Sequence, residues 1–346
     1  MHRTLFALLA IASFLTPALT MAQTVSKKEP VKMIFDTDMG NDIDDAMALA
    51  MVHQLARRGA IDLLAVTSTK DHPKSAAYID ALNTWYGFPD IPIGAVRDGA
   101  AKEEGRFNGQ VDRKDSAGKP LFPHDLVSGT DAPEAVSLIR KTLAGQPDGS
   151  VMLVQVGFFT NFARLLESKG DEHSPLDGPA LIKAKVKELV LMAGAFQTIE
   201  HNTKHIEYNV KLDIPAAKKI ADAWPSPVIW SGYEIGIAAA YPWQSIMEDY
   251  NYVEPHLIKD SYLAYVPEHP HDRPTWDLTA VLYAVYPDRG YFTLSPKGHV
   301  RVDDEGRTDF SVKNDGNDFY LIMDEVQTAR VREAFVQLCS EPPVRQ

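Results

Sequence analysis

Residues 31–49 of the chain read VKMIFDTDMGNDIDDAMAL, and this stretch decides the fold class. It opens with a short, mostly apolar run, which predicts a buried strand over residues 31–35. Ala, Met and Leu then recur at helical spacing, which predicts a helix over residues 44–58. A buried strand that leads through a polar loop into a helix is typical of an α/β protein built from βαβ units.

The same alternation continues along the chain. It predicts strands over residues 63–68, 151–156, 189–193 and 228–230, and helices over residues 74–86, 132–143, 162–168, 215–223, 277–285 and 325–338. No linker rich in Pro, Gly or Ser divides the chain, so we expect one α/β domain over residues 30–341. Residues 97–128 lack periodicity and predict either a lid over a site or a surface insertion. The part after Tyr291 resembles an antiparallel appendage with a closing helix.

The first 22 residues have the pattern of a secretory signal peptide. Arg3 gives a positive start, residues 5–15 are almost wholly apolar, and small residues end the stretch at Ala22. The alternative is a membrane anchor, but a bilayer span needs about 20 apolar residues and this run is shorter. We therefore expect an exported protein, periplasmic or secreted, with no stable membrane insertion.

The composition limits the partners. Of the 346 residues, 45% are hydrophobic and 24% are charged, which is the balance of a globular protein. The formal net charge is −12, whereas nucleic-acid-binding proteins carry a basic excess, so we expect no nucleic-acid partner. The one cysteine, Cys339, allows neither an intrachain disulfide nor a thiolate zinc cage.

The loop after the first predicted strand is strongly acidic. Residues 36–45 hold five aspartates, which repel one another and are costly to bring together without a cation. A helix N-terminus would relieve one or two of these charges, with Asp42 or Asp44 as a cap, and a solvated acidic loop is the plainer alternative. Oxygen ligands of this kind suit Ca²⁺ or Mg²⁺, and ligands bind at the carboxyl ends of strands in open α/β sheets. The sequence therefore predicts a metal site that coincides with a substrate site.

Three later segments also carry polar residues: GFFTN over residues 157–161, EYN over 207–209 with DIPAA over 213–217, and the pair Trp276-Asp277. Together with the acidic loop, and in this order, they resemble the calcium-dependent inosine-uridine nucleoside hydrolases. The corresponding family segments are GPLTN, EFN with DPEAA, HD and, for the loop, DxDPGxDD. The resemblance implies hydrolysis of the N-glycosidic bond of small ribosides to free base and ribose. It also implies a single open mixed, mainly parallel sheet flanked by helices, a Rossmann-like fold, in a homodimer or homotetramer.

The resemblance implies which residues bind calcium. The ligands would be Asp38, Asp45, Asp277 and a backbone carbonyl at Thr160 or Phe159. A bound metal lowers the pKa of water, and Asp38 is the carboxylate that we expect to take the proton as general base.

The same resemblance assigns the contacts with the substrate. Asp44 would hold ribose hydroxyls, and the other expected substrate-binding residues are Asp71, Asn161, Asn202, Glu207 and Asn209. Two of these assignments differ from the rest. Asp71 stands where the family has an asparagine, and Asn161 could instead cap the following helix.

The sequence departs from the family pattern around the leaving base. Trp276 stands where many members have the histidine that protonates the base, and the pair Asn41-Asp42 is inserted in the first loop. His271 is a candidate proton donor, with an exposed loop position as the alternative. Trp276 itself is a candidate for stacking on the base, with core packing as the alternative.

Two other functions share parts of this sequence pattern. Residues 33–38 also fit the start of a haloacid-dehalogenase-type phosphatase, but that scheme needs Thr or Val where Gly40 stands. A periplasmic sugar- or nucleoside-binding protein would share the export signal, the acidity and the α/β sheet. Binding alone, however, leaves the packed aspartates unexplained.

Overall fold

A ten-stranded sheet organises the molecule, with strand order β3-β2-β1-β4-β5-β6-β10-β8-β9 and with β7 paired to β10. This computed structural model describes residues 29–199, 201–266, 268 and 270–343, so the predicted signal peptide, residues 1–22, lies outside the described residues. The strands are β1 Val31–Thr37, β2 Ile61–Ser68, β3 Ile93–Ala95, β4 Val151–Gln155, β5 Val186–Met192, β6 Val228–Ser231, β7 Thr293–Leu294, β8 Gly298–Val302, β9 Thr308–Val312 and β10 Asp318–Ile322.

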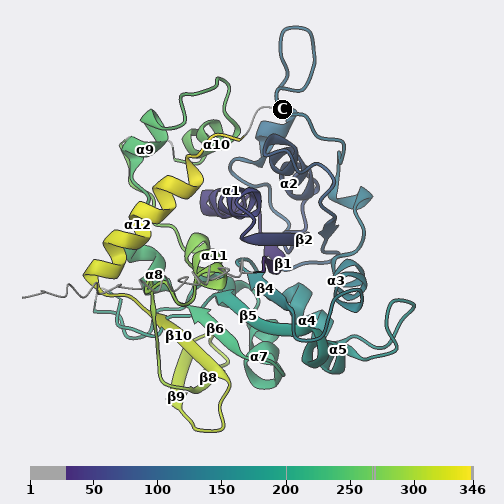
Figure 1. Cartoon of the computed structure of the whole chain (residues 1–346), viewed down its shortest axis with the longest axis vertical. Helices are drawn as coiled ribbons and strands as arrows, with labels where there is room; N and C mark the ends of the chain where they lie inside the picture. The colour runs from purple at the N-terminus through teal and green to yellow at the C-terminus, as the bar shows by residue number, and fades with distance from the viewer. Residues whose placement is uncertain (1–28, 200, 267, 269, 344–346) are drawn as a thin grey trace, which may run out of the picture.

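Helices cover both faces of the sheet (Figure 1). One face packs against α1 Ile43–Arg57, α2 Pro73–Trp85, α8 Tyr233–Ala238, α9 Trp243–Glu248, α10 Leu257–Tyr265, α11 Asp277–Val285 and α12 Glu325–Cys339. The other packs against α3 Ala135–Ala144, α4 Thr160–Glu167, α5 Gly178–Lys185, α6 Tyr208–Leu212 and α7 Ile214–Ala223. Two 3₁₀ helices, η1 Asn108–Asp112 and η2 Gly129–Asp131, lie between β3 and α3. None of the helices described is long and apolar enough to span a bilayer.

The strand β1 shows why its sequence is apolar almost without interruption. Met33 and Phe35 belong to the core on the α1 side, whereas Ile34 between them belongs to the core on the α4 side. Successive side chains of a strand point to opposite faces, so a parallel strand with helices on both sides must be apolar on both. The strand ends where Asp36 to Asp38 begin the acidic loop.

The predicted α/β class, with an open mixed and mainly parallel sheet, is confirmed. Strands β1 to β6 pair in parallel, and every predicted strand and helix is present with its ends shifted by at most three residues. The expected antiparallel appendage needs one correction. Strands β7, β8 and β9 are antiparallel to their neighbours, but β10 pairs in parallel with β6 and so continues the main sheet.

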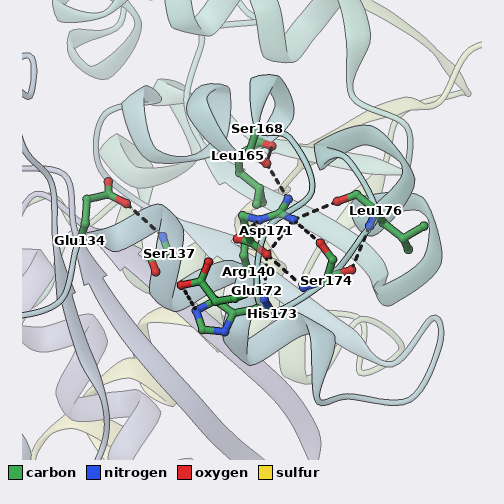
Figure 2. Close-up of polar contacts among 10 residues, drawn as sticks. All are labelled: Glu134, Ser137, Arg140, Leu165, Ser168, Asp171, Glu172, His173, Ser174 and Leu176. Atoms are coloured by element: carbon green, nitrogen blue, oxygen red, sulfur yellow. Dashed lines mark hydrogen bonds and ion pairs between the residues drawn. The ribbon is translucent and has the colours of Figure 1, made fainter.

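A buried arginine on α3 fixes the loop that follows α4 (Figure 2). The Arg140 guanidinium pairs with the Asp171 carboxylate, with 2.5 Å between Arg140 Nε and Asp171 Oδ2. It also donates to the hydroxyl of Ser168 and to the carbonyls of Ser174 and Leu176. The hydrogen bond from Arg140 to Asp171, with those from the backbone N–H groups of His173 and Ser174, holds the pKa of Asp171 well below its usual value. The cluster lies away from the acidic loop and is a structural one.

Candidate active site

A cavity of about 200 Å³ opens where β1, β4 and β5 end, and we call it the main cavity. Its acidic lining residues are Asp38, Asp42, Asp44, Asp45, Asp277 and Glu207. Its other lining residues are Asn41, Val156, Met192, Tyr208, Asn209, Tyr233 and Trp276. The cavity therefore lies at the carboxyl edge of the parallel strands, where the sequence predicted a site.

Helix α1 begins inside the acidic loop and places two carboxylates in its first turn. Asp44 and Asp45 occupy this turn, where free N–H groups and the helix dipole favour negative charge. The Thr37 hydroxyl donates to Asp45, and the Asn41 amide donates to Asp38. The carboxylates of Asp45 and Asp38 thus each accept a hydrogen bond from a side chain nearby in the same stretch of chain.

A hydrogen bond from a distant segment completes the acidic lining. Asp44 Oδ2 accepts the backbone N–H of Trp276 at 2.8 Å and that of Asp277 at 3.3 Å. Both donors lie at the start of α11, where backbone N–H groups have no partner within the helix. Asp44 therefore caps α11 and brings Asp277 into the main cavity.

Burial raises the pKa of every carboxylate at the cavity floor. It raises the pKa of Asp38 to about 7 and that of Asp44 to about 6, and the negative charge of Asp42 adds to both shifts. It also raises the pKa of Asp45, with Asp38 and Asp44 as the next causes. The pKa of Asp277 is raised well above its usual value by burial and then by Asp44, Asp45 and Asp38. These carboxylates lie close enough to oppose one another's ionisation.

Two cations, the partly exposed Arg273 and the buried Lys70, lie beside this cluster. The Arg273 guanidinium pairs with Asp42 at 2.9 Å and lies over the ring of Trp276. The Lys70 ammonium, whose side chain is fully buried, donates to Asn41 Oδ1 at 2.5 Å. Neither cation bonds to Asp38, Asp45 or Asp277, so the charge of these three is not neutralised by a salt bridge among the described residues.

The donor set suits a hard divalent cation. Asp38, Asp45 and Asp277 are each at most 5% exposed, and Asp44 Oδ1 is buried without a hydrogen-bond partner among the described residues. Buried carboxylates that lack cationic partners are stabilised by a bound metal. Within the residues that the structure describes, however, no three such side chains are grouped tightly enough to enclose an ion. The carboxylates converge on one cavity but do not close around one point.

The EYN segment forms another wall of the main cavity. Glu207 is the N-cap of α6, and its carboxylate accepts the N–H groups of Asn209 at 2.8 Å and Val210 at 3.1 Å. Burial raises the pKa of Glu207 to about 7. The Asn209 amide donates to the carbonyls of Val156 at 3.0 Å and Met192 at 3.3 Å, which joins this wall to the ends of β4 and β5.

An aromatic wall faces the carboxylates. The rings of Trp276 and Tyr233 lie 5.4 Å apart between centroids, and the Trp276 indole N–H donates to the Tyr233 carbonyl at 2.8 Å. The indole fits because position 236 is glycine: a Cβ on Gly236 would lie 2.0 Å from the indole ring. The His205 ring is tilted against the Tyr233 ring, with 4.0 Å between the ring centroids. The wall is a flat surface on which a planar group can stack.

The expected carbonyl ligand at Thr160 does not line the main cavity. Its hydroxyl instead donates to Asp213 at 2.6 Å, and both Thr160 and Phe159 lie where α4 begins. The residue of this segment that lines the cavity is Val156, which directly follows β4. Thr160 is the first residue of α4, whereas Val156, the residue that directly follows β4, borders the cavity.

Four other expected site residues also lie outside the main cavity. His271, the expected proton donor, is exposed, and its backbone carbonyl accepts the Tyr262 hydroxyl. Asp71 accepts the N–H of Gly99, and exposed Asn202 accepts that of Lys204. Asn161 is fully buried beneath the site, where its amide donates to Asp36 and to the Ser68 carbonyl. The structure thus places these four residues outside the lining of the main cavity.

Sequence reasoning missed six lining residues: Asn41, Asp42, Val156, Met192, Tyr208 and Tyr233. Asn41 and Asp42 form the inserted pair in the acidic loop, so the insertion itself was the available signal. Val156 and Met192 end predicted strands, and Tyr208 lies inside the EYN segment. Tyr233 comes from a short helix after β6 that no motif marked.

Comparisons with known proteins agree with this geometry. Residues 33–333 match the sequence profile of the family described as inosine-uridine preferring nucleoside hydrolase. The pyrimidine-specific ribonucleoside hydrolase RihA of Shewanella sp. (strain MR-4) is 29% identical over 205 residues, which cover 59% of this chain and 59% of that protein. Uridine nucleosidase 1 of Arabidopsis thaliana is 28% identical over 190 residues, which cover 54% of this chain and 52% of that protein. The chain thus spans little more than half the length of the curated relatives that it matches.

The fold is shared more completely than the sequence. A plant nucleoside hydrolase, the enzyme PpNRh1, superposes with a TM-score of 0.68 at 21% identity, covering 90% of this chain and 100% of that one. The purine-preferring ribonucleoside hydrolase from Gardnerella vaginalis superposes with a TM-score of 0.65 at 19% identity, covering 89% of this chain and 98% of that one.

Proposed function

Since the chain belongs to the inosine-uridine preferring nucleoside hydrolase family, we propose that it hydrolyses the N-glycosidic bond of ribonucleosides in the main cavity. The proposal rests on the contact between two segments that lie far apart in the chain. Asp44 and Trp276, 232 positions apart, are joined by a hydrogen bond, and around them lie buried carboxylates and an aromatic wall. This combination suits a sugar at the carboxylates and a planar base at the aromatic rings.

We propose calcium as the metal of this site. Asp38, Asp45 and Asp277 would hold it, with the Val156 carbonyl in the role that the sequence predicted for Thr160. The donors are all oxygen atoms, which calcium prefers, and the buried carboxylates need a positive partner. When bound, the ion supplies an acidified water and an anchor for two neighbouring ribose hydroxyls.

The protein's own groups then have distinct tasks. Asp38 lies in the main cavity beside the proposed metal, where its carboxylate can accept the proton of the attacking water. Asp44 is held by α11 with Oδ1 unpartnered, and this oxygen accepts a ribose hydroxyl. Glu207 and Asn209 define the opposite side of the sugar. Cleavage of a glycosidic bond passes through a transition state that resembles an oxocarbenium ion, which the surrounding carboxylates stabilise.

The base departs past Trp276 and Tyr233. Stacking on these rings fixes the plane of the base while its bond to the sugar breaks, so the aromatic wall orients the leaving group. His271 is placed outside the main cavity, so we assign the wall, and not this histidine, to the leaving-group side.

A substrate assay tests the proposed function. The protein is incubated with inosine, uridine, adenosine and p-nitrophenyl phosphate, each with calcium, with magnesium or with EDTA, and free base, ribose and phosphate are measured. We expect ribose and base in equal amounts, only with calcium. Phosphate release with magnesium would favour the phosphatase, and tight riboside binding without any turnover would favour a binding protein.

Export and assembly are further proposals. The pattern of residues 1–22 supports cleavage of a signal peptide and a periplasmic or secreted location. The N-terminal residue of the protein recovered from outside the cytoplasm tests this. Family membership supports a homodimer or homotetramer, which the molar mass in solution tests.

A further inference from the structure

A lysine that follows β2 holds the acidic loop in place. The Lys70 side chain is fully buried, and its ammonium donates to Asn41 Oδ1 at 2.5 Å. The same ammonium pairs at 2.8 Å with the carboxylate of Glu103, which lies on the segment between β3 and η1. Taking an ammonium out of water costs free energy, which good hydrogen-bond and charge partners must offset. Asn41 and Glu103 are the partners that offset this cost here.

The ion pair with Glu103 alone does not explain why this lysine is buried. The nearby Lys74 attaches residues 104–112 to α2, because it pairs with Glu104 at 2.7 Å and with Asp112 at 2.9 Å. The Lys74 side chain stays 30% exposed, so an attachment of this kind needs no buried charge. The contact that requires Lys70 to lie inside the protein is the one with Asn41.

One orientation of the Asn41 amide satisfies both of its neighbours. An ammonium has only donors, so Lys70 faces the amide oxygen. The amide nitrogen donates to Asp38 Oδ2, and an ionised carboxylate has only acceptors. The Asn41 backbone N–H also donates to the Asp38 carbonyl, at 3.3 Å. A hydrogen bond to one carboxylate oxygen fixes the plane of the carboxylate, so Asn41 sets the direction in which Asp38 Oδ1 points.

The other residue of the inserted pair is also held by a cation. Asp42 pairs with Arg273 at 2.9 Å and accepts the hydroxyl of Tyr265. Both partners belong to the late part of the chain, whereas Lys70 follows β2. The inserted pair thus fixes the acidic loop to two separate parts of the molecule.

We propose that Lys70 is a positioning residue of the active site: it orients the Asn41 amide, and this amide orients the Asp38 carboxylate toward the attacking water. The inference rests on the proposed function and deepens it. In the reaction, the water oxygen bonds to C1′ while the C1′–N bond breaks and its electron pair leaves with the base. The water proton passes to Asp38, and the released base takes a proton from solvent, so Lys70 gains and loses no proton. Lys70 acts by keeping the proton acceptor aligned, and proton transfer depends strongly on this alignment.

A double-mutant cycle tests this chain of contacts. The variants are Lys70→Met, which removes the charge but keeps most of the apolar stem, Asn41→Leu, and the two combined. Each single substitution should lower kcat for uridine and inosine by about tenfold or more, because it removes a hydrogen bond to a charged group. KM should change by less than about threefold, since the contacts with the sugar remain. Because both residues act on the same carboxylate, the double variant should lose no more than about twofold beyond the larger single loss.

Lys185→Met is the matched control. The Lys185 ammonium also has one carboxylate partner, Asp148 at 2.8 Å, and one uncharged oxygen partner, the Gln146 carbonyl at 2.8 Å. It lies at the end of α5 and does not line the main cavity. A lysine that only stabilises the fold should affect the melting temperature and not catalysis, so we expect Lys185→Met to leave both kcat and KM unchanged.

A second measurement does not depend on catalysis. In NMR spectra of protein with isotope-labelled asparagine, the side-chain N–H pair of Asn41 is the pair that Asn41→Leu removes. One proton of this pair is bonded to the Asp38 carboxylate, so its exchange with water should be slow in the native protein. Lys70→Met should speed this exchange by about tenfold or more, and Lys185→Met should not change it.

The remaining outcomes separate the inference from the proposed function. A near-normal kcat in Lys70→Met or in Asn41→Leu would overturn the positioning role while hydrolysis stands. Single losses that multiply to about a hundredfold in the double variant, or losses confined to KM, would overturn it as well. If Lys70→Met does not fold, Asn41→Leu decides, because the Asn41 side chain is only partly buried.

A native protein that cleaves no riboside would overturn the proposed function. The Asn41 exchange rate then decides on Lys70. Faster exchange in Lys70→Met would support the hold of Lys70 on the Asn41 amide, and unchanged exchange would overturn both proposals.

Discussion

The Asp44 carboxylate on α1 accepts the backbone N–H of Trp276 at 2.8 Å, just before α11 begins. This single contact joins the acidic loop near the start of the chain to the aromatic and acidic residues near its end. The contact also gives Asp44 a structural role among the carboxylates of the site, because the first N–H groups of α11 need an acceptor.

Asp44→Ala is expected to weaken both the fold and the site. The loss of a helix cap costs about 1 kcal/mol of unfolding free energy, and it releases Trp276 and Asp277 from their places. The matched control is Asp324→Ala, because Asp324 caps α12 with a complete capping box far from the cavity residues. Urea unfolding and riboside kcat/KM measure both effects. Activity lost equally in both variants would contradict the joining role of Asp44.

Asp38→Asn should abolish turnover while riboside binding remains. The amide cannot accept the proton of water, and the loss of a general base lowers rates by about a hundredfold to ten-thousandfold. Single-turnover kinetics and calorimetric riboside binding measure the two parts. Asp62→Asn, at an exposed carboxylate paired with Lys32, is the control. A near-normal rate in Asp38→Asn would remove Asp38 as the base.

Metal binding should depend on pH through the buried carboxylates. Asp38 and Asp44 have a pKa of about 7 and about 6 in the fold, above the ordinary aspartate value of 3.8. Folding is therefore favoured while they are protonated, and this contribution is lost as the pH rises through the raised pKa values. The melting temperature of the metal-free protein should fall between about pH 5 and about pH 8, and calcium should offset the fall.

The measurement is the difference in melting temperature between protein in calcium and protein in EDTA. The buried His53, whose pKa is lowered to about 4 by burial, destabilises both forms alike at low pH, so it cancels in this difference. We expect the difference to grow by about 3 °C or more from low to high pH. A difference that is constant with pH would mean that the metal does not bind at these carboxylates.

Trp276→Ala should lower kcat/KM for ribosides, whereas Trp276→Phe should keep most of it. An aromatic pair contributes about 1 kcal/mol beyond the area that it buries, which corresponds to about a fivefold change. Phenylalanine keeps a flat ring beside Tyr233 but loses the indole hydrogen bond to the Tyr233 carbonyl. Steady-state kinetics test whether the wall orients the base. If Trp276→Ala and Trp276→Phe are equally active, it does not.

Arg140→Met should destabilise the protein without changing catalysis. The substitution leaves the Asp171 carboxylate and two backbone carbonyls without their donor (Figure 2). Because Arg140 is buried while Asp171 is partly exposed, removing the buried partner should cost up to about 3 kcal/mol. Lys219→Met, which breaks an exposed pair with Glu167, should cost less than about 1 kcal/mol. Chemical unfolding measures both, and similar costs would show that burial does not matter here.

The fold could be predicted from the sequence because its parallel strands are apolar on both faces. Strands such as β1 and β4 stand out as unbroken apolar runs, and long helices such as α1 and α12 show helical spacing. The parallel pairing of β10 with β6 could not be predicted, because it joins strands almost ninety positions apart and no local pattern marks it.

The site could be predicted where function depends on residues in a marked segment. Asp38, Asp45 and Glu207 lie in such segments and line the main cavity. Thr160 and Asn161 lie in one as well, but they form the first turn of α4, and their side chains donate to Asp213 and Asp36 and do not line the cavity. Tyr233 could not be predicted, since its place depends on how the start of α8 packs against the residues after β5, where its N–H donates to the Gly194 carbonyl.

The buried Cys339 at the end of α12 gives the molecule a built-in reporter. Its thiol is fully buried, lies 3.6 Å from the Met47 carbonyl on α1, and is the only one in the sequence. A maleimide can react only when the last helix separates from the first, so the alkylation rate of the native protein measures how often these helices separate. Because α1 also carries Asp44 and Asp45, substrate or calcium that tightens this helix should slow the labelling, without any probe being engineered into the chain.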